Sequence, residues 1–113
     1  MSSKNLNIAI AGATGFVGLD LVYYLSKHPK VKIKYLLAQK NVGKKIQVFD
    51  KRIKKKLPAI STIKKINWKS IDLLFLSLPN GEAQKLIKKL FKYKNIKFID
   101  LSADFRIESP KLY

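Results

Sequence analysis

A glycine-rich stretch that directly follows an apolar run constrains this 113-residue chain more than any other feature. The apolar run covers residues 8–11, and the loop after it reads Gly12-Ala13-Thr14-Gly15-Phe16-Val17-Gly18. Apolar residues at helical spacing follow, so the order predicts a strand, a tight turn and a helix. Gly12 can adopt the backbone angles of a sharp turn, Gly15 has no Cβ where a pyrophosphate would approach, and Gly18 lets the helix lie close to the sheet.

The backbone of this loop is suited to binding an anion. Thr14 is placed to cap the helix expected from about Gly15, so free N–H groups and the positive end of the helix dipole would face a phosphate. The spacing G-x-x-G-x-x-G is less common than G-x-G-x-x-G, and a tight turn in an unrelated α/β domain is the alternative. The candidate contacts to a dinucleotide are Gly12, Ala13, Thr14, Gly15, Phe16, Val17 and Gly18.

Further apolar runs predict more strand–helix units in what the length makes a single domain. Strands are expected over residues 31–38, 71–78 and 96–101, and a helix over 83–91. The first helix is expected to end at His28, with the imidazole on its last carbonyls. Residues 41–68 are the least regular part, with a candidate short strand over 46–49. The pattern predicts an α/β fold: a Rossmann-type parallel sheet with helices on both faces.

Four loops follow the carboxyl ends of the expected strands, where open parallel sheets bind their ligands. From the three loops after the glycine loop, the candidate contacts to the cofactor are Gln39, Lys40, Leu78, Pro79 and Ser102. The second strand ends without the acid that would accept a hydrogen bond from the ribose of NAD, and Lys40 there predicts a contact to the 2′-phosphate of NADP. The alternative is that Lys40 is one more exposed lysine.

Arg106 is the arginine of these loops and a candidate for binding a substrate carboxylate or phosphate. The alternative is that it only holds its loop through Asp104. Structural roles are favoured for Asp100 and Asp104, so no residue is assigned to catalysis and none to a metal. The chain has no cysteine, which excludes disulfides, zinc–thiolate sites and a cysteine nucleophile within it.

A formal net charge of +17 raises the question of a nucleic-acid or membrane partner. Only Arg52 and Arg106 among the 24 basic residues are arginines, although phosphate and base recognition relies on arginine. We interpret the basic cluster 51–56 as solvated surface and expect no nucleic-acid partner. Residues 1–7 show no targeting pattern and no apolar run approaches the roughly 20 residues of a membrane span, so we expect no membrane partner and a cytoplasmic location.

The segment 98–107 contains the sequence D-L-S-A-D-F-R. It closely resembles the signature of the N-acetyl-gamma-glutamyl-phosphate reductases, the arginine-biosynthesis members of the semialdehyde dehydrogenase superfamily. The glycine loop looks like the family's G-A-S-G-Y-T-G, residues 43–45 resemble its G-K loop, and residues 77–81 resemble its A-L-P-H-G turn, with Asn80 where histidine is common. The resemblance covers essentially the whole chain.

This resemblance implies an NADP-dependent enzyme that reduces a small acyl-phosphate substrate to an aldehyde through a cysteine thioester, acting as a homo-oligomer when complete. The cysteine and the acid/base histidine of such enzymes belong to a second domain. Residues 1–113 are therefore expected to be an NAD(P)-binding domain, incomplete at its C-terminal end, that binds cofactor without catalysis. The alternatives are an aspartate-semialdehyde dehydrogenase fragment and a stand-alone nucleotide- or RNA-binding module.

Overall fold

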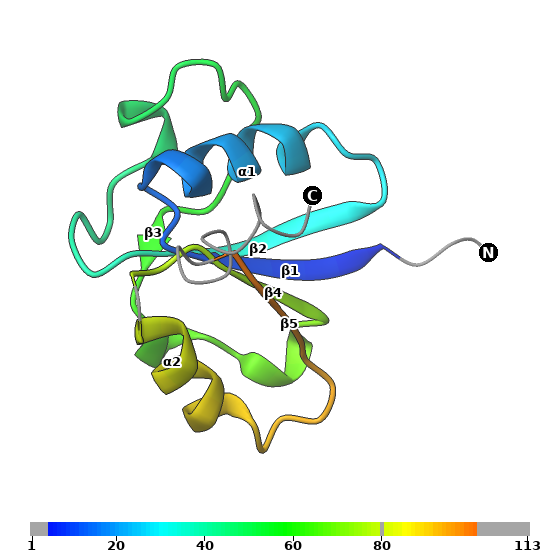
Figure 1. Cartoon of the computed structure of the whole chain (residues 1–113). Coiled ribbons are helices and arrows are strands. Elements are labelled where there is room, and N and C mark those ends of the chain that lie inside the picture. The colour runs from blue at the N-terminus through cyan, green and yellow to red at the C-terminus, as the bar shows by residue number, and fades with distance from the viewer. Residues whose placement is uncertain (1–4, 80, 102–113) are drawn as a thin grey trace, which may run out of the picture.

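A parallel β-sheet forms the centre of the computed structural model, which describes residues 5–79 and 81–101 (Figure 1). The sheet is built from β1 (Leu6–Ala11), β2 (Val31–Leu37), β3 (Ile60–Ser61), β4 (Leu73–Leu76) and β5 (Lys97–Asp100). Their order is β3-β2-β1-β4-β5, with β1 in the middle. All four pairings are parallel, which confirms the Rossmann-type sheet predicted from the sequence.

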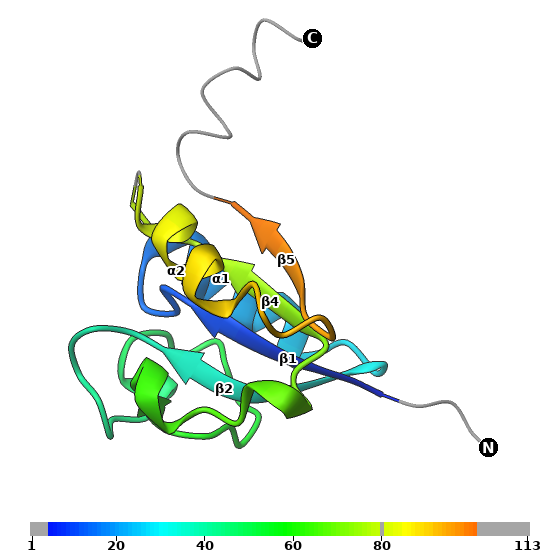
Figure 2. The same ribbon diagram turned by 90° about the horizontal axis from the view of Figure 1, so that it is seen from below.

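Two helices cover opposite faces of the sheet, as Figure 1 shows. Helix α1 (Phe16–Ser26) connects β1 to β2, and α2 (Glu82–Leu90) connects β4 to β5. Figure 2 shows α2 lying across one face, while the open edge of β5 lies at the side of the sheet. Within residues 5–79 and 81–101, no helix has the length and apolarity needed to cross a membrane.

The alternation of side chains along β1 divides the core into two layers. Ile8 and Ile10 are fully buried on the face of α1, where Val22 packs against them. Ala9 and Ala11 point to the other face, in the layer that also holds Trp68. Successive strand residues point to opposite faces, so one short apolar strand supplies both layers.

A bulge in β2 explains a break in that alternation. The register runs Ile8 to Ile33 and then Ala9 to Tyr35, so Lys34 is the extra residue on β2. An extra residue reverses the side-chain direction of the rest of the strand. Ile33 and Leu36 therefore both lie in the α1 layer although they are three residues apart.

The irregular segment differs from the prediction. Residues 46–49 were expected as a short strand but form the 3₁₀ turn η1 (Ile46–Val48), in which the amides of Phe49 and Asp50 donate to the Ile46 carbonyl. The reason is the spacing of the apolar residues. Ile46, Phe49 and Ile53 pack into the same layer, and residues three and four apart share a face in a helical turn but not in a strand. Two further 3₁₀ turns, η2 (Ile63–Lys65) and η3 (Trp68–Ser70), precede β4.

The ends of α1 also differ from the prediction. The His28 imidazole does not cap the helix: its Nδ1 accepts a hydrogen bond of 3.0 Å from the Lys30 amide and so stabilises the turn into β2. The last carbonyls of α1 are reached instead by backbone amides, those of Lys27 and His28. The proline after His28 prevents the helix from continuing, so the imidazole lies beyond the last turn.

Candidate functional site

The loops that follow β1, β2 and β4 meet at the carboxyl edge of the sheet. The amides of Gly12 and Ala13 both donate to the Leu37 carbonyl at the end of β2, at 2.9 and 3.1 Å. On the other side, a Cβ added to Gly12 would collide with the Ser77 carbonyl oxygen, just after β4. The glycine loop is thus held between its two neighbours, as the sheet order requires.

Two of the three glycines are required by close packing. Gly12 has a φ of +78°, a conformation that residues with a side chain rarely adopt. A Cβ on Gly18 would collide with the carbonyl oxygen of Gly12, so the first turn of α1 rests directly on the end of β1. Both roles agree with the functions expected of these glycines.

The first turn of α1 presents amides that have no acceptor. The helix begins at Phe16 with Gly15 as its N-cap, and the first helical hydrogen bond runs from the Leu19 amide to the Gly15 carbonyl at 2.8 Å. Across the described residues, no acceptor meets the amides of Thr14, Phe16, Val17 and Gly18. Unpaired amides at a helix N-terminus favour an anion, because they add to the positive end of the helix dipole.

The prediction that Thr14 caps this helix is wrong. The helix begins one residue later than a Thr14 cap requires, and no side chain hydrogen-bonds to its first amides. A capping side chain reaches the second or third amide after itself only from the N-cap position. Because no side chain caps them, the first amides of α1 stay available to an anionic ligand.

Gly15 differs from its two neighbours because packing does not require it to be glycine. Its φ is −79°, and an added Cβ would meet only the Gly12 carbonyl oxygen, at an ordinary 3.7 Å. The residue is exposed, and the Phe16 side chain beside it is 95% exposed. The described part of the chain therefore leaves open space in front of the unpaired amides.

The loop after β2 places cations near this edge. Gln39 and Lys40 are exposed, and Lys40 forms no ion pair with a described carboxylate. The first acid after β2 is Asp50, which is paired with Arg52. The acid that would bind a ribose hydroxyl is therefore absent here, as the sequence indicated.

The left-handed backbone of this loop was not predicted from the sequence. Asn41 has a φ of +67°, and Gly43 follows at +92°. The turn is held against β3 by two backbone hydrogen bonds. The Gly43 amide donates to the Ile60 carbonyl at 2.8 Å, and the Ile60 amide donates to the Lys44 carbonyl at 2.9 Å. Asparagine tolerates the left-handed conformation, and the Asn-Val-Gly sequence was the available signal.

The turn after β4 contributes backbone and one apolar side chain. Leu78 is half-buried against the α2 layer, and its Cδ2 would lie 3.2 Å from a Cβ on Gly12. Pro79 is exposed, and its carbonyl accepts a hydrogen bond from the Glu82 amide at 3.0 Å. Helix α2 is capped by Gly81 at a φ of +84°, while Asn80 lies outside the described residues.

The last loop is described only at its start. The Leu101 amide donates to the Leu76 carbonyl at 2.7 Å, which extends the pairing of β5 with β4 toward the same edge. Asp100, at the end of β5, is half-buried. Ser102, Asp104 and Arg106 lie outside the described residues, so their predicted roles stay predictions.

A parallel sheet in the order 3-2-1-4-5, with a glycine loop leading into unpaired helical amides between the central strands, defines a Rossmann-type nucleotide-binding domain. Comparison with known families agrees: residues 7–113 match the family model described as "Semialdehyde dehydrogenase, NAD binding domain". The chain belongs to this family, whose cofactor is a nicotinamide dinucleotide.

Curated relatives carry a more specific name. N-acetyl-gamma-glutamyl-phosphate reductase of Ehrlichia ruminantium (strain Gardel) is 41% identical over 98% of this chain and 32% of its own length. The reductase of Rhodospirillum rubrum is 37% identical over 98% of this chain and 33% of its own length. A probable chloroplastic reductase of Oryza sativa is 34% identical over 99% and 27%. The chain spans about a third of the length of these relatives.

Solved structures show the same fold at lower sequence identity. Aspartate semialdehyde dehydrogenase with NADP from Candida albicans superposes with a TM-score of 0.72 at 24% identity, over 93% of this chain and 32% of that chain. Aspartate semialdehyde dehydrogenase II from Vibrio cholerae gives 0.72 at 22% identity, over 94% and 33%. At such identity the likeness is one of fold.

Proposed function

We propose that this chain is the cofactor-binding part of an N-acetyl-gamma-glutamyl-phosphate reductase and that the carboxyl edge of its sheet binds NADP(H). The observation that carries the proposal is the set of unpaired amides at residues 14 and 16–18, in front of the open position at Gly15. Helical amides with no partner stabilise a bound pyrophosphate. The reductase relatives, aligned over 98% of the chain, support the same assignment.

The preference for NADP over NAD is attributed to the loop after β2. In this fold the adenosine ribose lies at the end of the second strand. Lys40 and Lys44 are exposed there, and residues 38–49 contain no carboxylate. A cation at this position attracts a 2′-phosphate, whereas an acid would repel it.

The proposed reaction of the complete enzyme is the NADPH-dependent reduction of N-acetyl-glutamyl 5-phosphate to the 5-semialdehyde, with release of phosphate. The dinucleotide supplies the hydride. Ser102 is proposed to contact the cofactor and Arg106 the substrate. Because the 113 residues include no cysteine, the thiol that forms the thioester must come from outside them. Homo-oligomeric assembly and a cytoplasmic location belong to the same proposal.

Gly15→Val tests the site directly. The valine Cβ fits the backbone and meets no close neighbour, so the fold is preserved, but its methyl groups occupy the space in front of the amides. Calorimetric titration with NADP should show affinity at least tenfold lower than for the wild type. The control is Lys88→Ala, an exposed residue of α2. Unchanged affinity of Gly15→Val, with an unchanged melting temperature, would refute the proposed edge.

Lys40→Ala tests the choice of cofactor. An exposed lysine–phosphate contact contributes about 1–2 kcal/mol, so NADP affinity should fall about five- to thirtyfold while NAD affinity stays the same. The fall should be larger at low salt, because screening weakens exposed charges. Lys88→Ala again serves as the control for overall charge. If the wild type binds both dinucleotides equally, or the mutant keeps the wild-type ratio, Lys40 does not contact the cofactor.

A further inference from the structure

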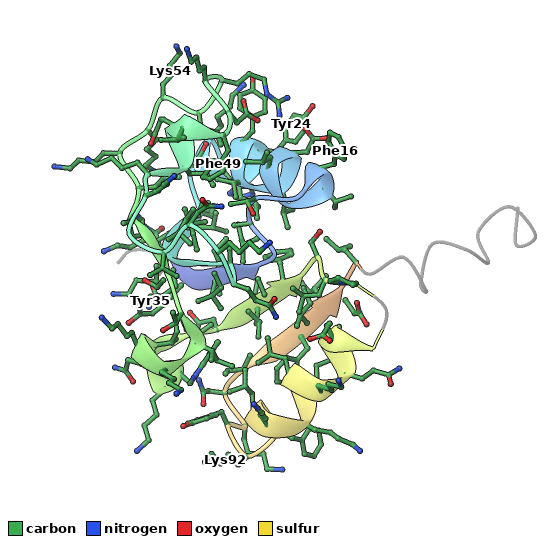
Figure 3. All side chains as sticks on the ribbon, turned by 90° about the vertical axis from the view of Figure 1, so that its left-hand side faces the viewer. Phe16, Tyr24, Tyr35, Phe49, Lys54 and Lys92 are labelled. Atoms are coloured by element: carbon green, nitrogen blue, oxygen red, sulfur yellow. The ribbon has the colours of Figure 1, made fainter. Side chains whose placement is uncertain are left out.

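A hollow of about 380 Å³ lies beside the C-terminal half of α1, away from the glycine loop. Its lining residues are Tyr23, Ser26, Lys27, Arg52, Lys54 and Lys55. The 11 residues of α1 span about 16 Å, so the lining turns are separated from the Gly15 end by most of the helix. Figure 3 shows Lys54 at one end of the molecule, with Lys92 beyond α2 at the other.

The hollow gathers positive charge without a carboxylate in its lining. It holds three ammonium groups and one guanidinium, whose charge is offset by Asp20 and Asp50. In the described part of the chain, Lys27, Lys54 and Lys55 form no ion pair. An adjoining hollow of about 370 Å³ shares Ser26 and Lys55 with the first and adds further lysines. Like charges held together in a concave surface repel one another, and a multivalent anion relieves that repulsion.

Arg52 is fixed in place by two acids from different elements. Its Nη2 lies 2.7 Å from Asp20 Oδ1 on α1 and 2.7 Å from Asp50 Oδ2 in its own loop. The guanidinium carbon also lies 4.5 Å from the centre of the Tyr23 ring. These contacts fasten the loop that carries Lys54 and Lys55 to the helix, so the hollow exists before any ligand arrives.

Tyr23 offers a hydrogen-bond donor in this hollow. Lys27 Nζ donates to the Tyr23 hydroxyl oxygen at 3.2 Å, and an ammonium group can only donate. The phenol hydrogen is therefore left for another acceptor, and none of the described residues accepts it. The Ser26 hydroxyl donates its only hydrogen to the Tyr23 carbonyl at 2.8 Å, so it has none to donate to a ligand.

We propose that this hollow binds a small ligand that carries a chain of phosphate groups, at a site separate from the cofactor edge. Three unpaired ammonium groups exceed what a single phosphate needs, and the Tyr23 hydroxyl adds a neutral donor. Phosphate oxygens accept from ammonium and hydroxyl groups alike. A free polyphosphate and the triphosphate of a nucleotide share this chemistry.

The test uses the 113-residue chain labelled with ¹⁵N, titrated with tripolyphosphate and separately with ATP at physiological salt. Amide shifts are expected at residues 23–27 and 52–57 with both probes. The double variant Lys54→Ala/Lys55→Ala should bind tripolyphosphate about fivefold or more weakly. Its matched control is Lys88→Ala/Lys89→Ala, which removes the same charge from an exposed pair in the last turn of α2.

Tyr23→Phe adds a test of the hydroxyl, because it keeps the ring under Arg52 and removes only the donor. We expect binding about two- to threefold weaker, with the fold retained in the amide spectrum.

Equal weakening by the two lysine pairs would show diffuse attraction by net charge and overturn the proposal. Shifts confined to residues 12–18 would overturn it as well, since the phosphates would then be bound at the glycine loop.

Discussion

Gly12 joins three strands through one backbone position without a side chain. Its amide binds the end of β2, its φ is +78°, and its α-carbon faces the Ser77 carbonyl after β4. A side chain would meet both backbone strain and a collision at once. The residue therefore determines how closely the glycine loop approaches the sheet.

Gly12→Ala is expected to lower the free energy of unfolding by about 2–5 kcal/mol, since left-handed strain and overpacking add. Gly18→Ala should also destabilise, through the collision with the Gly12 carbonyl, although alanine favours the helix. Urea denaturation measures both. Gly15→Ala is the matched control and should change stability by less than about 1 kcal/mol; a loss equal to that of Gly12→Ala would contradict the packing described.

At the scale of elements, Arg52 links α1 to the loop that follows η1. Hydrogen bonds from the Arg52 side chain are the main cause that lowers the pKa of Asp50, and its backbone amide and charge act in the same direction. The contacts run from Nε to Oδ1 at 3.0 Å and from Nη2 to Oδ2 at 2.7 Å. The same contacts raise the pKa of Arg52, so the arginine stays charged.

This link predicts a pH dependence. Because the pKa of Asp50 is lower in the folded than in the unfolded chain, the pair stabilises fully above the ordinary aspartate pKa. The stabilisation is lost as the pH falls through the lowered value. In an NMR titration of the carboxyl carbon, Arg52→Gln should raise the midpoint of Asp50 toward an ordinary aspartate. Lys51→Gln, which removes the neighbouring charge, should leave the midpoint nearly unchanged.

Elements with strong periodicity could be predicted, and short ones could not. The apolar run Ile8 to Ala11 and the helical spacing after Gly18 each specify one local structure. The sequence therefore predicted both β1 and α1. Strand β3 has two residues, Ile60 and Ser61, and gains its place only by pairing with Leu36 and Leu37. Such a pairing leaves no periodic signal.

The sequence predicted the backbone of the candidate site better than it predicted the roles of the side chains. Gly12 and Gly18 have the steric roles assigned to them, because glycine in a strand–turn–helix order permits few alternatives. Thr14 was misassigned, since a shift of one residue in the helix start removes a cap. The left-handed Asn41 had a local signal in the Asn-Val-Gly sequence, whereas the pairing of Gly43 and Lys44 with the distant Ile60 has none.

At the scale of the whole chain, the 113 residues contain the proposed cofactor edge but no thiol. Purified alone, the 113-residue chain should show no phosphate-dependent formation of NADPH from the semialdehyde, NADP and phosphate, because a thioester cannot form. A spectrophotometric assay at 340 nm measures this. Activity restored by adding a cysteine-containing catalytic domain would agree with the proposal, whereas activity of the chain alone would disprove it.

The central place of β1 has a consequence for synthesis of the chain. Strand β1 ends at Ala11, but its partner β4 ends at Leu76, 65 residues later. At about 5–20 residues per second, the ribosome takes roughly 3–13 s to make the intervening residues. During that time one edge of the apolar strand Ile8 to Ala11 has no native partner. For those seconds the backbone of this edge is open to pairing with other strands.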